Sequence, residues 1–337
     1  MQNPEISKSL VICLTAFNYI YAQFDKNIGK HDVLCTSEEL ANWIKVNYKY
    51  KISDIYVVEF RNKIFLKNHF TNDENKDLLN KLRKNNYQQY YLSFISGWLM
   101  NWLQKKIGLV LNKCIITDDG ISNLIIQPTN NYYLKQILAF VISGKQKSFS
   151  KYRDFNSRHA KKIITIYSDL PINKLNLPKE TIDIKNNVKN LCFQNRESNY
   201  PLLSKEYGIY ITSDRGVYNK NHSQIVENIS TQIKKLEDKT QVNWIIKTKA
   251  TDPLNQNYLE KGLHVASHKI NQELMLDRNL KFACTNYDTF LLNSVLLQFP
   301  IKCFVRNHEP TYFMHKEKVN VIKPLLQKCK NVNEFNF

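Results

Sequence analysis

Short apolar runs alternate with stretches of helical spacing along the first half of the chain. In AFNYIYAQFDKN and SEELANWIKVNY, aromatic and aliphatic residues recur at the spacing of one helix face. Apolar runs that alternate with such helices predict the buried strands of a mostly parallel sheet. The predicted strands of the first half are Ser9–Thr15, Lys51–Phe60, Tyr90–Ile95, Lys113–Asp119 and Lys161–Leu170.

The same alternation returns after residue 200. The clearest helix is SQIVENISTQIKKLED, which is amphipathic over its whole length. A final helix over Lys323–Cys329 packs either on its own half or back on the first half. The predicted strands of the second half are Tyr207–Asp214, Val242–Ala250, Lys281–Asn286 and Ile301–Val305, and the shorter predicted helices are Asn271–Asn279 and Tyr287–Phe299.

The stretch between the halves has a different composition. Residues 171–200 contain two prolines and many asparagines, which are typical of a connection. We therefore expect an α/β fold with an N-terminal Rossmann-like domain over 1–170, a linker over 171–200 and a C-terminal domain over 201–337. The 337 residues suit two domains of ordinary size. A cleft between two such domains is the expected place for a ligand.

The charge of the chain points to an anionic partner or environment. Its 48 Lys and Arg residues against 30 Asp and Glu residues give a net charge of +18. This excess fits an anionic polymer, an anionic small substrate or an anionic membrane surface. The lysines are dispersed and no known nucleic-acid motif is present, so we expect no nucleic acid as a partner. A basic nucleic-acid-binding protein stays open as an alternative.

The cysteines and histidines predict neither disulfides nor a metal site. The seven cysteines are scattered without a C-x-x-C pair, and most lie in apolar runs, which favours reduced thiols and a cytoplasmic protein. His264 and His268 are four residues apart but have no acidic residue between them, so a surface helix is the favoured interpretation. No uninterrupted apolar window approaches 18 residues, and we expect neither a signal peptide nor a spanning helix.

Four junctions between a predicted strand and the helix that follows it concentrate polar residues. In open α/β sheets, ligands bind beyond the carboxyl ends of strands, so these junctions are the places to search. A helix start with hydroxyl groups can bind an anion, and two lysines on a neighbouring strand end can complete a phosphate site. The candidates are Thr15 and Asn18 after the first strand, Asp118, Asp119 and Gly120 in CIITDDGISN, Lys247, Thr248 and Lys249 in IIKTKATDP, and Thr285, Asn286 and Thr289 in CTNYDTFLLN.

Each junction also has a purely structural interpretation. The TDDG stretch can be an ordinary turn, because Asp and Gly are typical turn residues. Thr285 and Thr289 can simply cap a helix, and Lys247 and Lys249 can lie on an exposed edge of a lysine-rich protein. The four junctions together favour a site with an acid and a phosphate-binding face. That combination suits transfer of a group from an activated, phosphate-bearing donor.

Several of these segments resemble a known family in the same order along the chain. SLVICLTAFNYIYA is similar to the opening of the bacterial sialyltransferases of glycosyltransferase family 52. CIITDDGISN resembles the acidic motif that several bacterial sialyltransferase families share, and KKIITIYSDLP resembles a strand that follows it. NWIIKTKATDP occupies the place of their Lys-x-His-Pro segment. INQELML and KFACTNYDTFLLNSVLL resemble the later glutamate-containing helix, with Glu273, and the Ser/Thr-rich motif.

The resemblance implies a GT-B fold, in which two Rossmann-like domains face each other across a cleft. It also implies an inverting, metal-independent transfer of sialic acid or a related nonulosonic acid. The donor would be a CMP sugar bound mainly by the C-terminal half, and the acceptor a glycan or glycolipid of surface polysaccharide, capsule or lipooligosaccharide. Asp119 would be the general base, with Asp118 as its alternate, Gly120 would allow close approach, and Asp214 in ITSDRG is a third acid. The charge would suit peripheral contact with the anionic inner membrane.

The chain departs from the family pattern at the histidine that contacts the donor phosphate. Lys249 stands where that histidine is expected and Ala250 where the proline is expected. An ammonium group neutralises a departing phosphate, although it protonates it poorly near neutral pH. Three alternatives stay open: Lys249 replaces the histidine, His264 or His268 enters from the following segment, or the protein binds without catalysis.

Overall fold

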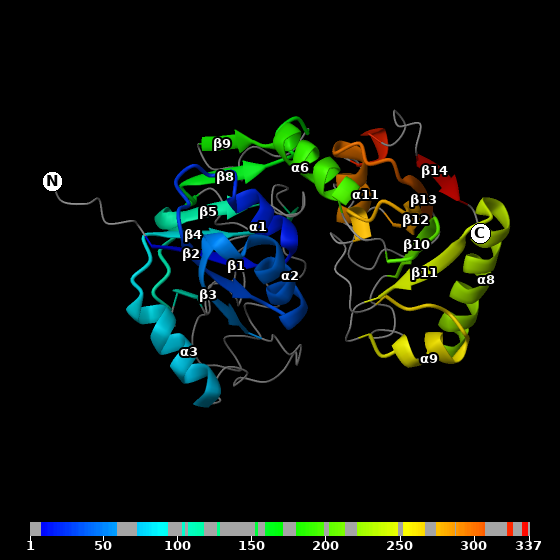
Figure 1. The fold of residues 1–337 in the computed structure, drawn as a ribbon, viewed down its shortest axis with the longest axis horizontal. Helices are drawn as coiled ribbons and strands as arrows, with labels where there is room; N and C mark the ends of the chain where they lie inside the picture. The colour runs from blue at the N-terminus through cyan, green and yellow to red at the C-terminus, as the bar shows by residue number, and fades with distance from the viewer. Residues whose placement is uncertain are drawn as a thin grey trace. The chain divides into compact units, whose positions relative to one another are not determined.

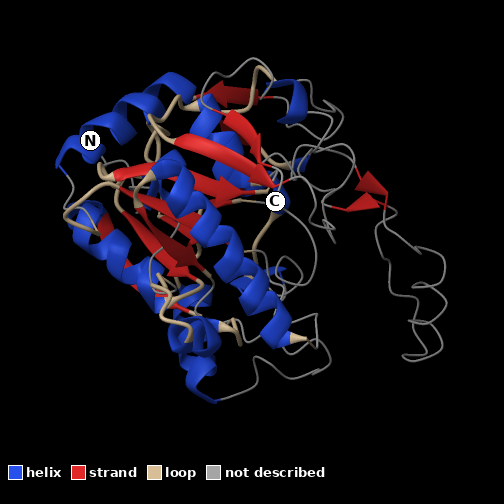
Figure 2. Cartoon of the chain, turned by 90° about the vertical axis from the view of Figure 1, so that its right-hand side faces the viewer, coloured by secondary structure: helices blue, strands red, loops and turns tan. Residues whose placement is uncertain are grey.

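The protein folds into two compact α/β units, Met1–Ile184 and Lys185–Phe337 (Figure 1). The computed structural model describes residues 8–58, 73–93, 103–104, 107–117, 127–128, 152–153, 159–170, 180–198, 202–212, 221–248, 252–266, 274–286, 288–306, 322–325 and 332–335. Each unit has its own parallel sheet. Figure 2 shows the helices of the chain beside its strands. No helix in these ranges is long and apolar enough to cross a membrane.

The first unit contains a seven-stranded sheet in the order β3-β2-β1-β4-β5-β8-β9, and every neighbouring pair is parallel. Its first strands follow the Rossmann order 3-2-1-4-5, so the chain reverses its direction of growth between β1 and β4. Its elements are β1 (Ser9–Cys13), α1 (Ala16–Ala22), β2 (His31–Cys35), α2 (Glu38–Tyr48), the short 3-10 helix η1 (Lys49–Lys51), β3 (Ile52–Val57), α3 (Asp73–Lys84), β4 (Gln89–Leu92), η2 (Leu111–Lys113), β5 (Cys114–Thr117), the antiparallel pair β6 (Gln127–Pro128) and β7 (Tyr152–Arg153), β8 (Lys162–Thr165) and β9 (Glu180–Asp183).

The second unit contains a five-stranded parallel sheet in the order β11-β10-β12-β13-β14. Numbered within the unit, this is the order 2-1-3-4-5 of flavodoxin-like sheets, which reverses between β10 and β12. Its elements are α6 (Lys185–Ser198), β10 (Tyr207–Ile211), α8 (His222–Thr240), β11 (Asn243–Lys247), α9 (Asn255–Glu260), β12 (Leu280–Thr285), α11 (Thr289–Leu296), β13 (Lys302–Arg306) and β14 (Val332–Phe335).

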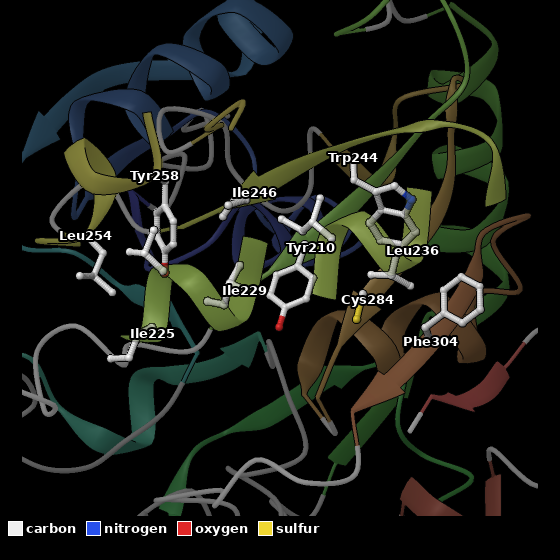
Figure 3. Close-up of a cluster of buried hydrophobic side chains, with 12 residues drawn as sticks. Tyr210, Ile225, Ile229, Leu236, Trp244, Ile246, Leu254, Tyr258, Cys284 and Phe304 are labelled. Atoms are coloured by element: carbon white, nitrogen blue, oxygen red, sulfur yellow. The ribbon is translucent and has the colours of Figure 1, made fainter. Parts of the chain in front are cut away.

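The amphipathic face of α8 forms much of the core of the second unit. Ile225, Ile229 and Leu236 of this helix are buried against the sheet. Figure 3 shows them with Trp244 and Phe304, which project from the strands. A helix with one apolar stripe is stabilised chiefly by burying that stripe, and here the sheet supplies the partner surface.

The predicted α/β class with two mostly parallel sheets is confirmed. Ser37 is the N-cap of α2, and its hydroxyl oxygen accepts a hydrogen bond from the Leu40 N–H at 3.3 Å. Six of the seven cysteines are described, and all six are buried free thiols, as expected. Among the described strands and α-helices, the sequence patterns did not predict β2, α3, β6, β7, β9, α6, α9 or β14.

The segment predicted as a linker contains regular structure. Within 171–200 the chain forms β9, which pairs with β8, and then α6. β9 is an edge strand with mostly exposed side chains, so it needs no apolar run. In α6, Val188 and Cys192 are buried four residues apart. The boundary between the units falls after Ile184.

Candidate functional site

The carboxyl ends of the strands beside each reversal point are where such sheets bind ligands. In the first unit this edge follows β1, β4 and β5, and in the second it follows β10, β11 and β12. Most of the candidate site residues that were predicted from the sequence, and that the structure describes, lie at one of these two edges.

Hydroxyl side chains end four neighbouring strands of the first sheet. In the part of the chain that the structure describes, neither the Thr15 nor the Thr117 hydroxyl has a hydrogen-bond partner. Buried polar atoms are nearly always paired, so two unpaired hydroxyls at one edge call for an explanation. The four residues are Thr15 after β1, Ser93 after β4, Thr117 in β5 and Thr165 in β8. The sequence patterns did not single out Ser93 and Thr165.

Asn18 lies in the first turn of α1 and is completely buried. Its Oδ1 accepts hydrogen bonds from the backbone N–H groups of Leu14 and Thr15, both at 2.9 Å. Its Nδ2 donates to the backbone carbonyl oxygen of Thr117 at 2.8 Å. The side chain therefore joins the turn after β1 to the last residue of β5, although β4 lies between these two strands.

The acid pair Asp118–Asp119 and Gly120 lie outside the described residues. They continue the chain directly from Thr117, which is fully buried at the end of β5. Their roles therefore stay predictions.

Lys247 ends β11 and is buried, with 8% of its surface exposed. The alternative interpretation, in which the Lys247 side chain is exposed to solvent, is therefore wrong. Its Nζ donates a hydrogen bond to the Thr248 carbonyl oxygen, and the Lys247 carbonyl accepts from the N–H and hydroxyl of Thr212 at 3.0 and 3.2 Å. Thr248 is buried as well, and its hydroxyl donates to the Asn255 side chain. A positive charge thus lies at the carboxyl end of the second sheet.

Thr285 ends β12 and is buried, and its hydroxyl donates to the carboxylate of Asp288. Asp288 is the N-cap of α11, where its Oδ1 accepts from the Leu291 N–H at 2.9 Å. The cap of this helix is therefore Asp288, while Thr285 orients the capping carboxylate. Asn286 follows β12 and Thr289 begins α11.

Arg306, at the end of β13, is a second buried cation at this edge that sequence analysis missed. Its guanidinium reaches across β12, donates to the Ile211 carbonyl oxygen at the end of β10, and lies 4.4 Å from the Tyr210 ring centroid. Burial raises the pKa of the neighbouring Cys284 thiol to about 12, and the charge of Arg306 acts in the opposite direction. The signal in the sequence was a cation directly after the apolar run IKCFV.

His264 is not brought into either edge. It is exposed, and it lies not in the predicted surface helix but in a segment that runs beside β11, where its carbonyl accepts from the Ile246 N–H at 2.8 Å. Within the described ranges, no group of three or more His, Cys, Asp or Glu residues could hold a metal ion. The candidates Lys249, Asp214, Glu273 and His268 lie outside those ranges.

Two solved structures resemble the chain over most of its length. UDP-GlcNAc 2-epimerase from Methanocaldococcus jannaschii is 12% identical with a TM-score of 0.46, and the match covers 98% of this chain and 89% of that one. The wall teichoic acid polymerase TagF is 10% identical with a TM-score of 0.45, covering 94% of this chain and 76% of that one. No protein-family model and no curated protein sequence matches the chain. The two parallel sheets and their strand orders define the α/β fold of the two units.

Proposed function

We propose that the protein is an inverting glycosyltransferase that moves a nonulosonic acid, such as sialic acid, from a CMP donor to a glycan acceptor. In this proposal the acceptor belongs to a surface polysaccharide or lipooligosaccharide, and the reaction needs no metal ion. The observation that carries the proposal is that the two sheets have different kinds of polar side chain at the carboxyl ends of their strands. Thr15 and Thr117, whose hydroxyls lack partners among the described residues, lie at strand ends of the first sheet, and the acid pair follows Thr117 in the sequence. Buried cations end strands of the second sheet.

The first edge suits a sugar acceptor. Thr15 and Thr117 carry hydroxyls that lack partners within the described residues, and hydroxyl groups both donate and accept, as sugar hydroxyls do. The carboxylates of Asp118 and Asp119 follow Thr117 in the chain. A carboxylate within hydrogen-bond reach of an acceptor hydroxyl can serve as general base.

The second edge suits the phosphate of a nucleotide donor. Lys247 and Arg306 place two positive charges at the ends of β11 and β13, on either side of the reversal point between β10 and β12. Charges in a buried, water-poor place act more strongly on a phosphate than they would in water.

The proposed reaction is a single displacement. The acceptor hydroxyl oxygen attacks the anomeric carbon of the donor sugar while the bond from that carbon to the phosphate oxygen breaks. CMP leaves with the electron pair, Asp119 or Asp118 takes the hydroxyl proton, and the anomeric configuration inverts. The cations at the second edge stabilise the phosphate charge that increases as CMP departs.

The first test is thermal unfolding with CMP, UMP, UDP or GDP in the presence of EDTA. A ligand that binds only the folded state stabilises it by about 2.7 kcal/mol at a hundred times its Kd, so selective binding gives a selective rise in Tm. We expect the rise with CMP. A rise with UDP or GDP alone contradicts the CMP donor, and no rise with any nucleotide at millimolar concentration contradicts the transferase.

The second test is transfer from CMP-sialic acid to glycan acceptors by the wild type and by Asp119→Asn and Asp118→Asn. Loss of a general base lowers kcat by about 10²- to 10⁴-fold. We expect this loss in one of the two variants, with CMP binding retained in both. CMP binding by a wild type that shows no turnover would instead support a binding protein that has lost catalysis.

A further inference from the structure

The side chain of Asn18 hydrogen-bonds to the protein backbone, which a residue that only binds the acceptor would not need to do. Its side chain is fully buried, and its Oδ1 and Nδ2 are both engaged by the backbone of the protein. The partners fix the orientation of the amide, because only the oxygen can accept from two N–H groups and only the nitrogen can donate to a carbonyl.

The carbonyl that Asn18 holds belongs to the peptide bond between Thr117 and Asp118. A peptide unit is planar, so a hydrogen bond to its carbonyl oxygen restrains the plane that also contains the Asp118 nitrogen. The Oδ1 of the same side chain is tied to the Leu14 and Thr15 N–H groups at the other side of the reversal point. One side chain thus ties the last carbonyl of β5 to the turn after β1.

We infer that Asn18 is a positioning residue for the acid pair Asp118–Asp119, which follows Thr117 in the chain. It acts through the Thr117 carbonyl and does not touch the substrate. The inference rests on the proposed function, since it concerns the carboxylate that the reaction uses as its base. A displacement of about 1 Å at a reacting group costs up to about 10²-fold in rate, so a single hydrogen bond at this place has a measurable effect.

Two substitutions distinguish the hydrogen bonds that the Asn18 Oδ1 accepts from the one that its Nδ2 donates. Asn18→Asp keeps an oxygen that accepts from Leu14 and Thr15, but an ionised carboxylate cannot donate to the Thr117 carbonyl. Asn18→Ala removes both kinds of hydrogen bond. The matched control is Asn85→Ala at the opposite edge of the same sheet, where the Asn85 amide donates to Asp32 at 3.0 Å and to the Tyr87 hydroxyl oxygen at 2.9 Å.

We expect both Asn18 variants to lower kcat about 10- to 100-fold while KM for the CMP donor and the Kd for CMP stay near wild type. The activity of Asn18→Asp relative to wild type should rise as the pH falls, because a protonated carboxyl regains the donor. Asn85→Ala should lower stability and leave kcat unchanged. A wild-type kcat in folded Asn18→Ala, or an equal kcat loss in Asn85→Ala, overturns the inference.

Amide hydrogen exchange tests the same contact without activity, which separates it from the proposed function. Absence of turnover in the wild type would contradict the proposed function alone. In that case faster exchange at residues 118–120 in Asn18→Asp, but not in Asn85→Ala, still supports the positioning role. Unchanged exchange in folded Asn18→Asp overturns it.

Discussion

Asp25 and Lys162 form an ion pair inside the first unit, with 2.7 Å between the Asp25 Oδ2 and the Lys162 Nζ. Both side chains are almost completely buried, and the Tyr91 hydroxyl also donates to the carboxylate at 2.9 Å. Burial alone would raise the pKa of Asp25. The hydrogen bonds from Lys162, the Asn27 N–H and Tyr91, with the charge of Lys162, outweigh burial and lower it. The pair lies at the amino end of β8, at the edge opposite to the candidate site.

Replacing one member of this pair should destabilise the first unit strongly. Lys162→Met leaves the Asp25 carboxylate buried without its cation, and removal of one partner from a buried pair costs about 3–5 kcal/mol. Chemical denaturation measures the cost. The double variant Asp25→Leu/Lys162→Met should recover part of it, since no charge is then left unpaired. A single variant with wild-type stability would contradict this role of the pair.

His31 should make the stability of the protein fall as the pH falls below about 6.5. The pKa of His31 is lowered, first by burial and also by the charge of Lys51, against the opposing effects of the Gly29 carbonyl and Asp32. The folded state thus favours the neutral ring, which can donate from Nδ1 to the Gly29 oxygen at 2.9 Å and accept from the Tyr19 hydroxyl at 3.0 Å. Unfolding takes up a proton below the pKa of the unfolded chain, so the contribution is complete above it and is lost on acidification.

The free energy of unfolding of His31→Gln, measured between pH 7.5 and 5, should show a smaller slope in this window. Asp25 has a lowered pKa as well, but its contribution is lost only below the ordinary carboxyl range near pH 4. The two effects are therefore separable. An unchanged slope in His31→Gln would mean that other groups dominate the window.

Gly208→Ala should disrupt the core of the second unit. Gly208 pairs with Trp244 across β10 and β11, and a Cβ at Gly208 would lie 2.4 Å from the Trp244 Cε2. The indole also packs near Phe282 and Phe304, which limits its room to move. Overpacking of this kind costs about 1–3 kcal/mol. In a Trp244→Leu background the same substitution should cost much less, and equal costs in both backgrounds would contradict a clash with the ring.

Sequence patterns predicted the strands and helices whose buried side chains are mainly apolar. The run SLVIC predicted β1, which is buried at every position, and the apolar stripe of SQIVENISTQIKKLED predicted α8, which is buried along one face. β2 was not predicted, because it begins with His31 and Asp32, two polar residues that are usually exposed. Both are completely buried, because Tyr19 and Tyr87 provide hydrogen bonds from other elements. Such partners cannot be identified from local spacing.

The candidate site was predictable to a similar degree. The rule that ligands bind at strand ends selected Thr15, Lys247 and Thr285, and the structure places each at the carboxyl end of a strand. It could not show that Asn18 reaches Thr117, because that contact depends on the position of β5 two strands away. Arg306 was missed for the same reason, since its role comes from reaching β10 across β12.

The proposed donor edge leads to a prediction for Lys247. If its ammonium faces the donor phosphate, Lys247→Met should weaken CMP binding about tenfold or more, because a hydrogen bond to a charged group contributes about 1.5–3 kcal/mol. Lys281→Met is the matched control, since Lys281 lies near the amino end of β12 and pairs with Glu206 at 3.4 Å in a partly exposed place. Calorimetric titration with CMP gives both affinities. Equal affinities in the two folded variants would remove Lys247 from the donor site and leave Arg306 as the described cation to test at that edge.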